Sequence, residues 1–302
     1  EKVDRIFSPG KLLLTSEYFV LDGALALAIP TKSGQEFFFE EIHDRNSEII
    51  WQAYHQEKLW LSIKINYRNW TILDTNLETP AKFVVSVLQH VQDLSNIRFH
   101  KENSYFLKTN LQFPPDFGLG SSSTLMNNLA EWAEIDSFQL NENALGGSGY
   151  DIAVAQEKSP ILYQALPEKK ISRVEFDPGF KNELIFIHLN QKQDSRKGIA
   201  LYRSKPRNNE LIHELSEITK AVFLAKTIDE FILYMNRHEL LISSFLGIET
   251  AKEKYFPQYG GFIKSLGAWG GDFVLASKFG DYKKYFSDRN FTRIFEWRDL
   301  VL

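Results

Sequence analysis

The chain has 302 residues, of which 43% are hydrophobic and 25% charged, a balance typical of a folded globular protein with room for two domains. The formal net charge of −4 gives no electrostatic reason to expect a nucleic-acid partner, and no apolar run approaches the roughly 20 residues that span a bilayer. The absence of cysteine excludes disulfides and thiolate chemistry. Residues 1–5 contain no apolar signal-peptide core, so we expect a cytoplasmic protein, either a monomer or a homodimer.

The first third of the sequence has the alternation of apolar and polar residues that predicts antiparallel strands. The strands are expected at Val3–Phe7, 37–39, 49–51 and 59–65. From residue 79 to 94 the apolar residues change to helical spacing, and Pro80 suits the first turn of a helix.

The remaining sequence alternates between strand and helix signals. Strands are predicted over 103–112, 183–189, 262–277 (two strands around a glycine-rich bend) and 291–302, and helices after Ser123, near Gly149–Asp151, over 211–223 and over 228–240. We therefore expect an α+β protein with mostly antiparallel sheets and two domains, residues 1–175 and 176–302.

A glycine- and serine-rich segment before the second predicted helix is the strongest chemical signal. Its glycines allow close backbone approach to a phosphate, and the helix that follows directs free N–H groups and its positive dipole end at the same place. It is neither a Walker A loop nor a dinucleotide-binding fingerprint, and taken alone it fits a capped helix after a flexible turn equally well. The candidate phosphate-binding residues are Pro114, Gly118, Leu119, Gly120, Ser121, Ser122 and Ser123.

Two further segments each have an ordinary interpretation by themselves. Lys11 follows a Pro-Gly turn and Glu17 comes six residues later, which alone would suggest a surface turn. The sequence from Lys264 to Gly271, KSLGAWGG, alone would suggest a hairpin. Together with Pro114–Ser122, and in this order, these segments resemble the three motifs of the GHMP kinase superfamily, which includes galactokinase, homoserine kinase, mevalonate kinase and phosphomevalonate kinase.

The resemblance implies a fold and a reaction. The fold would be a ribosomal protein S5 domain 2-like N-terminal domain followed by a ferredoxin-like C-terminal domain. The cofactors would be ATP and Mg²⁺, with the nucleotide phosphates held by the second motif and by Gly267, Ala268, Gly270 and Gly271. Asp151 would be the general base with Lys11 as its charge partner, although some members of the family transfer phosphate without such a base. The alternative for Asp151 is an N-cap role.

Fewer residues of the sequence match the metal and acceptor sites of the family than match its phosphate-binding motifs. Ser122 is the expected Mg²⁺ ligand, and Glu142 is the nearest acid where mevalonate kinases carry a metal-binding glutamate, because Leu140 occupies the matching position. Trp269 also departs from the family, which usually has glycine there. The candidate acceptor-binding residues are Glu17, Ser148, Ser195 and Arg196, the last two within a run of six cations over 192–207.

The acceptor is expected to be an acidic or phosphorylated alcohol. The segments Glu17–Leu21 and Gly270–Asp272 look more like bacterial phosphomevalonate kinases than sugar kinases, which favours phosphomevalonate or mevalonate. A kinase for another small alcohol or sugar remains an alternative, as does a non-catalytic homologue that binds a metabolite or a protein.

Overall fold

The computed structural model describes residues 4–302, so Val3, the first residue of the first expected strand, lies outside the described residues. The chain forms two compact units. Unit 1 contains residues 4–10, 33–115 and 119–158, and unit 2 contains 11–32, 116–118 and 159–302. Two long strands, β1 (Asp4–Leu13) and β2 (Ala26–Ile42), contribute residues to both units.

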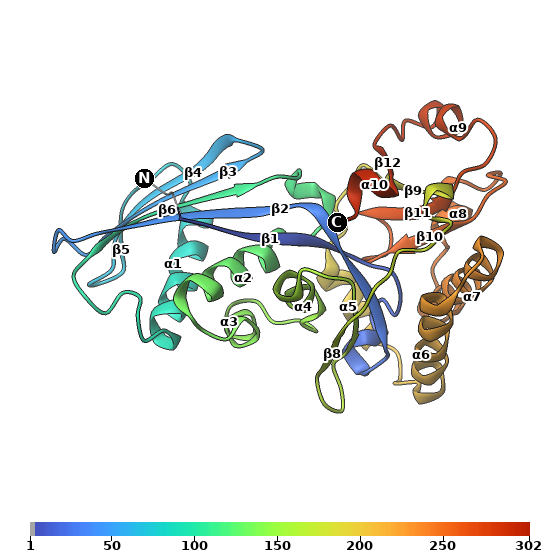
Figure 1. Ribbon diagram of the computed structural model, residues 1–302, viewed down its shortest axis with the longest axis horizontal. Coiled ribbons are helices and arrows are strands. Elements are labelled where there is room, and N and C mark those ends of the chain that lie inside the picture. The colour runs from blue at the N-terminus through green and yellow to red at the C-terminus, as the bar shows by residue number, and fades with distance from the viewer. Residues whose placement is uncertain (1–3) are drawn as a thin grey trace. The chain divides into compact units, whose positions relative to one another are not determined.

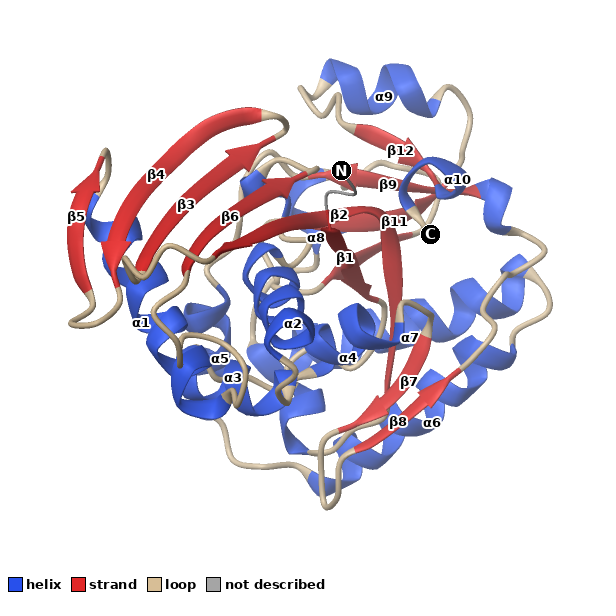
Figure 2. Ribbon diagram, turned by 60° about the vertical axis from the view of Figure 1, so that its left-hand side comes forward, coloured by secondary structure: helices blue, strands red, loops and turns tan. Residues whose placement is uncertain are grey.

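Unit 1 is a twisted sheet with helices on one face (Figure 1, Figure 2). Its strands follow the order β5-β4-β3-β6-β2, and only the β3–β6 pair is parallel. The further elements of this unit are β3 (Glu48–His55), β4 (Lys58–Asn66), β5 (Thr71–Thr75), α1 (Glu78–Leu94), β6 (Ser104–Leu111), α2 (Ser121–Ala133), α3 (Ser137–Ala144) and α4 (Tyr150–Glu157).

The core of unit 1 lies between this sheet and the helices. Phe37 and Trp51 from the strands pack with Leu88 of α1 and Trp132 of α2, and all four side chains are buried. The apolar stripe of α1 thus faces the sheet, as its spacing predicts. Phe83 is the exception, since it is 38% exposed.

Unit 2 combines a small antiparallel sheet, in the order β10-β11-β9-β12, with several helices. Residues 26–28 of β2 also pair with β7 in this unit, and β7 pairs with β8. Its elements are a 3-10 turn (Phe19–Asp22), β7 (Ile161–Gln164), β8 (Lys170–Arg173), β9 (Leu184–His188), α5 (Ser195–Arg203), α6 (Asn209–Leu224), α7 (Ile228–Leu246), α8 (Ala251–Tyr255), β10 (Ile263–Leu266), β11 (Phe273–Ser277), α9 (Tyr282–Asp288), β12 (Ile294–Glu296) and α10 (Trp297–Leu300).

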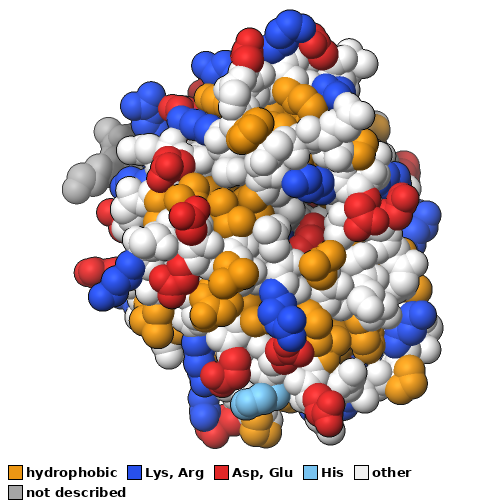
Figure 3. Space-filling model, turned by 90° about the vertical axis from the view of Figure 1, so that its right-hand side faces the viewer, with side chains coloured by type: hydrophobic (Ala, Val, Ile, Leu, Met, Phe, Trp, Pro, Cys, Tyr) orange, Lys and Arg blue, Asp and Glu red, His pale blue; other side chains and the backbone are white. Residues whose placement is uncertain are grey.

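The small sheet of unit 2 carries its own buried core, which includes Ile187, Phe256, Val274 and Phe286. The helices α6 and α7 pack against each other, and α7 also packs against β10. On the face shown in Figure 3, acidic and basic side chains are interspersed with apolar ones. On this face, recognition of a charged ligand would therefore depend on a local arrangement of side chains rather than on a field of one sign.

The prediction of one long strand over 291–302 is wrong in its second half. Only Ile294–Glu296 forms a strand, and the chain then turns into the short helix α10. This helix packs against β9 and β12, and its apolar side chains Trp297 and Leu300 are buried. No helix within residues 4–302 is long and apolar enough to cross a membrane.

Candidate functional site

The glycine- and serine-rich segment forms the connection between β6 and α2. Gly118 (φ 72°) and Gly120 (φ 89°) adopt left-handed backbone conformations that favour glycine, and α2 begins directly at Ser121. Gly120 is the N-cap of this helix, and no side chain caps its first turn. The first N–H groups of α2 therefore lack the intrahelical and side-chain partners that would compete with an anion.

The three serines at this helix start differ in their availability. The Ser123 hydroxyl is buried and donates to the Gly120 carbonyl at 3.1 Å. Ser122 is exposed and Ser121 is half-buried, and both line a hollow in unit 1. Gln35 fixes the start of the helix by donating from Nε2 to the Ser121 carbonyl at 2.8 Å. Ser121 and Ser122 are thus the serines that can present hydroxyl groups to a ligand.

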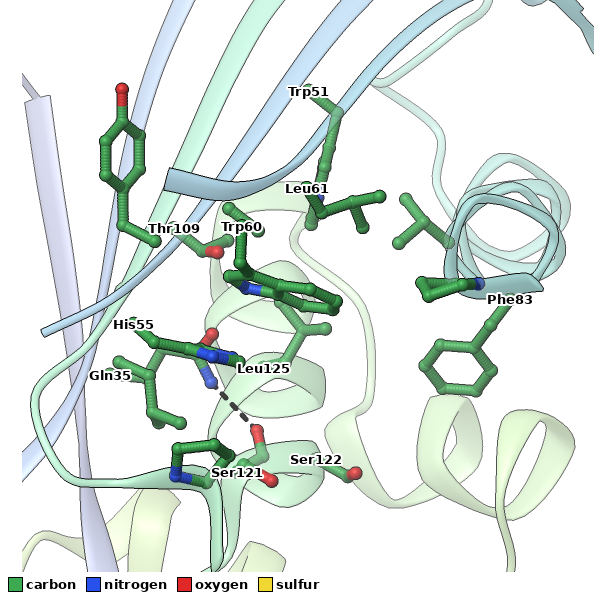
Figure 4. A pocket seen from close by; sticks show the side chains of 16 residues that line it. Gln35, Trp51, His55, Trp60, Leu61, Phe83, Thr109, Ser121, Ser122 and Leu125 are labelled. Carbon is green, nitrogen blue, oxygen red and sulfur yellow. Dashed lines mark hydrogen bonds between the residues drawn. The ribbon is translucent and has the colours of Figure 1, made fainter. Parts of the chain in front are cut away.

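The hollow beside these serines is aromatic and has a volume of about 260 Å³ (Figure 4). The rings of His55 and Trp60 stack with their centroids 4.5 Å apart and an interplanar angle of 20°. Phe83 and Pro80 of α1 complete the apolar lining, which explains why Phe83 stays outside the core. An aromatic slot of this kind accepts a flat heterocycle by stacking.

A β-bulge positions Trp60 in this slot. Ala53 pairs with Leu61 and Tyr54 pairs with Leu59, so Trp60 is the extra residue on its strand. Such an extra residue twists the strand locally and redirects its side chain. Burial lowers the pKa of the neighbouring His55, which keeps that ring neutral for stacking.

Three polar groups meet in unit 2 at the first part of the same connection. Lys11 Nζ donates to the Gly118 carbonyl at 3.0 Å. A Cβ atom added to Gly118 would lie 2.4–2.7 Å from the Asp272 carboxylate, so this carboxylate covers the Gly118 α-carbon. Burial raises the pKa of Asp272 to about 6, and the charge of Lys11 opposes this rise.

The third glycine-rich segment forms the turn between β10 and β11. Gly267 (φ 67°) and Gly270 (φ 99°) have left-handed conformations. A Cβ atom at Gly271 would lie 2.9 Å from both the Gln191 carbonyl oxygen and the Gln193 backbone nitrogen. Glycine is therefore required at this position by the close approach of the 191–193 backbone.

Glu17 was expected to contact the acceptor, but its side chain is only 1% exposed. Its Oε1 accepts a hydrogen bond from Lys264 Nζ at 2.7 Å, and Lys264 itself is fully buried. His238 Nε2 accepts the Ser16 N–H at 2.7 Å, and burial lowers its pKa well below the ordinary value, so this histidine is neutral with its proton on Nδ1. Glu17 thus joins the segment after Lys11 to the first residue of the third motif.

Asp151 lies in the first turn of α4 in unit 1. Gly149 occupies the N-cap position, so Asp151 is not the N-cap residue, and its Oδ1 accepts the Ile152 N–H at 3.0 Å. Its side chain is partly exposed, as is that of Ser148 in the preceding glycine-rich loop. A pairing of Asp151 with Lys11 stays a prediction.

The cation run over 192–207 is divided between different partners. Arg203 and Arg207 lie 2.7 and 3.7 Å from the Asp22 carboxylate, so they are already paired. Ser195 begins α5 and is exposed, and the Arg196 side chain is 90% exposed beside Asp194. Lys197 lines a hollow of unit 2.

Metal ligands are sparse in the described chain. Residues 4–302 contain no group of three or more histidine, aspartate or glutamate side chains that could hold a metal ion. Leu140 is fully buried in the core of unit 1, whereas Glu142 is exposed on α3. The available oxygen donors at the start of α2 are the hydroxyls of Ser121 and Ser122.

The site residues that sequence reasoning missed are mostly aromatic. Trp60, His55 and Phe83 line the hollow beside α2, and the Asp272 carboxylate lies against Gly118. Aromatic residues make up 14% of the sequence, and core packing alone accounts for such a content, so it marks no site. The usable signal was local, because Asp272 directly follows the third glycine-rich motif.

The chain is similar to proteins of known structure but not to known sequences. No family model and no curated protein sequence matches the chain. Its structure is similar to that of mevalonate kinase from Methanococcus jannaschii, with a TM-score of 0.70, 15% identity and coverage of 97% of this chain and 96% of that one. It is also similar to Streptococcus pneumoniae phosphomevalonate kinase in complex with phosphomevalonate and AMPPNP, with a TM-score of 0.68, 18% identity and 95% coverage of each chain.

A third similar structure is Lactococcus lactis galactokinase complexed with galactose, with a TM-score of 0.64, 12% identity and coverage of 96% of this chain and 89% of that one. All three are members of the GHMP superfamily. The resemblance seen in the sequence motifs is therefore confirmed at the level of the fold. The chain has the two-domain α+β fold of the GHMP kinases over nearly its whole length.

Proposed function

We propose that this chain is a kinase that transfers the γ-phosphate of Mg-ATP to mevalonate or phosphomevalonate. The observation that carries the proposal is the combination, within unit 1, of an aromatic hollow with a helix start that no side chain caps. A purine ring stacks on aromatic side chains, and phosphates bind at helix N-termini. A nucleoside phosphate needs both features side by side.

The phosphates would be held by backbone and side-chain donors. The N–H groups at the start of α2 and the hydroxyls of Ser121 and Ser122 supply them in unit 1, with Leu119 and Pro114 shaping the approach. Lys11 brings a positive charge to the Gly118 carbonyl of the same connection, and Gly267, Ala268, Gly270 and Gly271 stay candidates for phosphate binding. Phosphoryl transfer relies mainly on such positioning and charge neutralisation.

The oxygen ligands that this chain offers fit a Mg²⁺ ion that binds together with the nucleotide. Mg²⁺ is commonly held by substrate phosphates, water and one or two protein oxygens, and this chain offers the Ser122 hydroxyl rather than a cluster of acids. Glu142, exposed on α3, is the candidate for a further oxygen ligand. When bound, the ion would neutralise charge on the phosphates.

The acceptor oxygen would be activated by Asp151. Its carboxylate would take the proton of an acceptor hydroxyl, or orient an acceptor phosphate oxygen, while that oxygen forms a bond to the γ-phosphorus and the bond from the γ-phosphorus to ADP breaks. Ser148 and Ser195 are candidates for hydrogen bonds to the acceptor, and Arg196 is free to reorient because it is so exposed. Glu17 has a positioning role in this proposal, since its buried carboxylate holds Lys264.

An acidic acceptor is supported by the motifs around Glu17 and Asp272, which look like those of phosphomevalonate kinases. The similar Streptococcus pneumoniae structure contains phosphomevalonate, whereas the similar Lactococcus lactis structure contains galactose. A sugar or another alcohol is therefore the alternative acceptor. A non-catalytic homologue is the second alternative. It is favoured by Leu140, which stands where mevalonate kinases carry a metal-binding glutamate.

A coupled assay for ADP release tests these alternatives when Mg-ATP is offered with mevalonate, phosphomevalonate, homoserine or galactose. We expect turnover with mevalonate or phosphomevalonate, and loss of turnover in Asp151→Asn with the affinity for ATP retained. Tight binding of Mg-ATP without turnover of any acceptor would instead indicate a binding protein. An unchanged rate in Asp151→Asn would remove this residue from the mechanism.

A further inference from the structure

The connection between β6 and α2 belongs to unit 2 over three residues, 116–118. A short 3-10 turn, Pro115–Phe117, leads there into the left-handed Gly118. Phe117 is only 7% exposed, although connections normally run over the surface of a protein. A buried ring in the middle of a connection fixes the chain at that point. The groups that hold Phe117 therefore decide the conformation in which the chain enters the phosphate-binding glycines.

Phe117 is surrounded by aromatic rings from the small sheet of unit 2. Its ring stacks on that of His188, the last residue of β9, with centroids 4.7 Å apart and an interplanar angle of 29°. Phe273 of β11 and Phe295 of β12 contact it edge-to-face, with centroids 5.4 and 5.9 Å away. His188 and Phe273 are direct partners in the pairing of β9 with β11. Three strands thus contribute one ring each, and such aromatic pairs stabilise a contact beyond the area that they bury.

The hydrogen bonds of His188 determine which of its ring nitrogens carries the proton. The Asn190 N–H donates to Nδ1 at 3.1 Å, so Nδ1 is unprotonated. The proton is therefore on Nε2, which donates to the Asp116 carbonyl at 3.0 Å. The ring is fully buried, and burial lowers its pKa, while the charges of Asp116 and Arg293, which face it, act in opposite directions. Near pH 7 His188 is thus neutral and holds Asp116 by a hydrogen bond.

The next residue of the connection, Gly118, is contacted by two other groups of unit 2. Lys11 Nζ donates to its carbonyl at 3.0 Å, and the Asp272 carboxylate lies against its α-carbon. Glycine has no side chain to restrict its own backbone, so the direction of the chain at Gly118 depends on how residues 116 and 117 are held. Two residues later the chain reaches Gly120, the N-cap of α2. A change at 116 and 117 is therefore transmitted along the chain itself to the start of this helix.

We propose that His188 is a positioning residue of the phosphate-binding connection. Its neutral ring, protonated on Nε2, holds Asp116 by a hydrogen bond and Phe117 by stacking, so that the chain from Gly118 to Gly120 presents the start of α2 to the phosphates of a nucleotide. This inference rests on the proposed kinase function and adds to it a residue that lies outside the three sequence motifs. His188 acts through the backbone of the connection rather than by contact with the nucleotide.

The alternative is that His188 only fills the core of unit 2, and two substitutions separate these roles. His188→Phe keeps a ring against Phe117 but loses the hydrogen bonds with Asp116 and Asn190, whereas His188→Gln loses the stacking and can still donate to the Asp116 carbonyl. We expect the dissociation constant of Mg-ATP, measured by calorimetry, to rise about fivefold in His188→Phe and to stay within about twofold of the wild type in His188→Gln. A role in packing alone predicts the reverse order.

The pH dependence of Mg-ATP binding is a second readout. As the pH falls below 6.5, the ordinary pKa of histidine, the ring takes up a proton on Nδ1, which then opposes the Asn190 N–H. Between pH 8 and pH 5 the wild type should therefore lose more affinity than His188→Gln, whose side chain does not titrate. The control His213→Gln removes an exposed histidine of α6 and should keep the wild-type profile. Asp272 and the phosphates of ATP titrate in all three proteins and cancel from the comparison.

Nitrogen NMR of the histidine rings tests the tautomer directly, with His188 assigned by its loss in His188→Gln. At pH 7.5 we expect a protonated Nε2 and an unprotonated Nδ1. The opposite tautomer, a Mg-ATP affinity of His188→Phe no lower than that of His188→Gln, or a wild-type pH profile in His188→Gln would each overturn the proposal. A wild-type protein that does not bind Mg-ATP would refute the kinase function itself, whereas Mg-ATP binding that is indifferent to His188 would overturn only this inference.

Discussion

The buried ion pair of unit 2 provides the sharpest test of how the first and third motifs are held together. Lys264 is fully buried, its Nζ lies 2.7 Å from Glu17 Oε1, and it also donates to the Ser265 carbonyl at 2.8 Å. A second buried carboxylate, Glu239, accepts the Ser265 N–H at 2.8 Å. The substitution Lys264→Met removes the positive charge shared by this cluster and keeps an apolar stem of similar length.

The expected cost follows from the two carboxylates that this change leaves behind. Breaking a buried pair by removing one partner typically costs about 3–5 kcal/mol, because the remaining charge is buried without compensation. At about 2 °C per kcal/mol for a chain of this size, the melting temperature should fall by about 6–10 °C. The loss should be smaller at pH 5 than at pH 8, since Glu17 and Glu239, whose pKa values burial already raises, can then take up protons.

Thermal unfolding by calorimetry measures this effect, and two further variants interpret it. Lys278→Met removes a more exposed pair in the same unit, with Glu296 at 2.6 Å, and should cost at most about 1 kcal/mol. The double variant Glu17→Gln/Lys264→Met should recover about 2–3 kcal/mol relative to the sum of the single changes. A melting temperature for Lys264→Met no lower than that of Lys278→Met would refute this account of the cluster.

Other predictions concern a buried acid and a loop glycine. Burial raises the pKa of Glu239 to about 7, so its stabilising contribution is fully present below about pH 4.5 and is lost as the pH rises to about 7. The free energy of unfolding should therefore fall between pH 5 and pH 8, and in Glu239→Gln this fall should be smaller by up to about 3 kcal/mol. Urea denaturation at the two pH values measures it, and an unchanged pH profile in the variant would contradict the prediction. Gly118→Ala should weaken ATP binding and cost more stability than Gly247→Ala, because both glycines have φ near 70° but only at Gly118 would the new Cβ meet the Asp272 carboxylate. Equal losses in the two alanine variants would remove that contact from the account.

The sequence predicted the elements that depend on local periodicity. The helix expected over 79–94 is α1, Glu78–Leu94, and the two strands expected around the bend at Gly267 are β10 and β11. The expected final strand was half wrong because Trp297 and Leu300 stand at i and i+3, a spacing that fits one turn of helix rather than the alternation of a strand. Both side chains are buried where α10 packs on β9 and β12.

The site was predictable where a backbone conformation demanded a residue type. The glycines of the second and third motifs stand where left-handed conformations or close backbone contacts require them. The aromatic hollow was not predictable, because it depends on a one-residue bulge that turns Trp60 onto His55. The burial of Glu17 was equally hidden, since its partner Lys264 is 247 residues away in the sequence.

We expect a nucleotide base to occupy the aromatic hollow of unit 1, with its phosphates at the start of α2. A crystal structure with AMPPNP and Mg²⁺, combined with ATP titrations of Trp60→Leu and the control Trp70→Leu, tests it directly. We expect the adenine to stack on Trp60 and the phosphates to lie at Ser121 and Ser122, and we expect the ATP dissociation constant to rise about tenfold in Trp60→Leu alone. An empty hollow with the nucleotide bound elsewhere, and an unchanged ATP affinity in Trp60→Leu, would contradict the account.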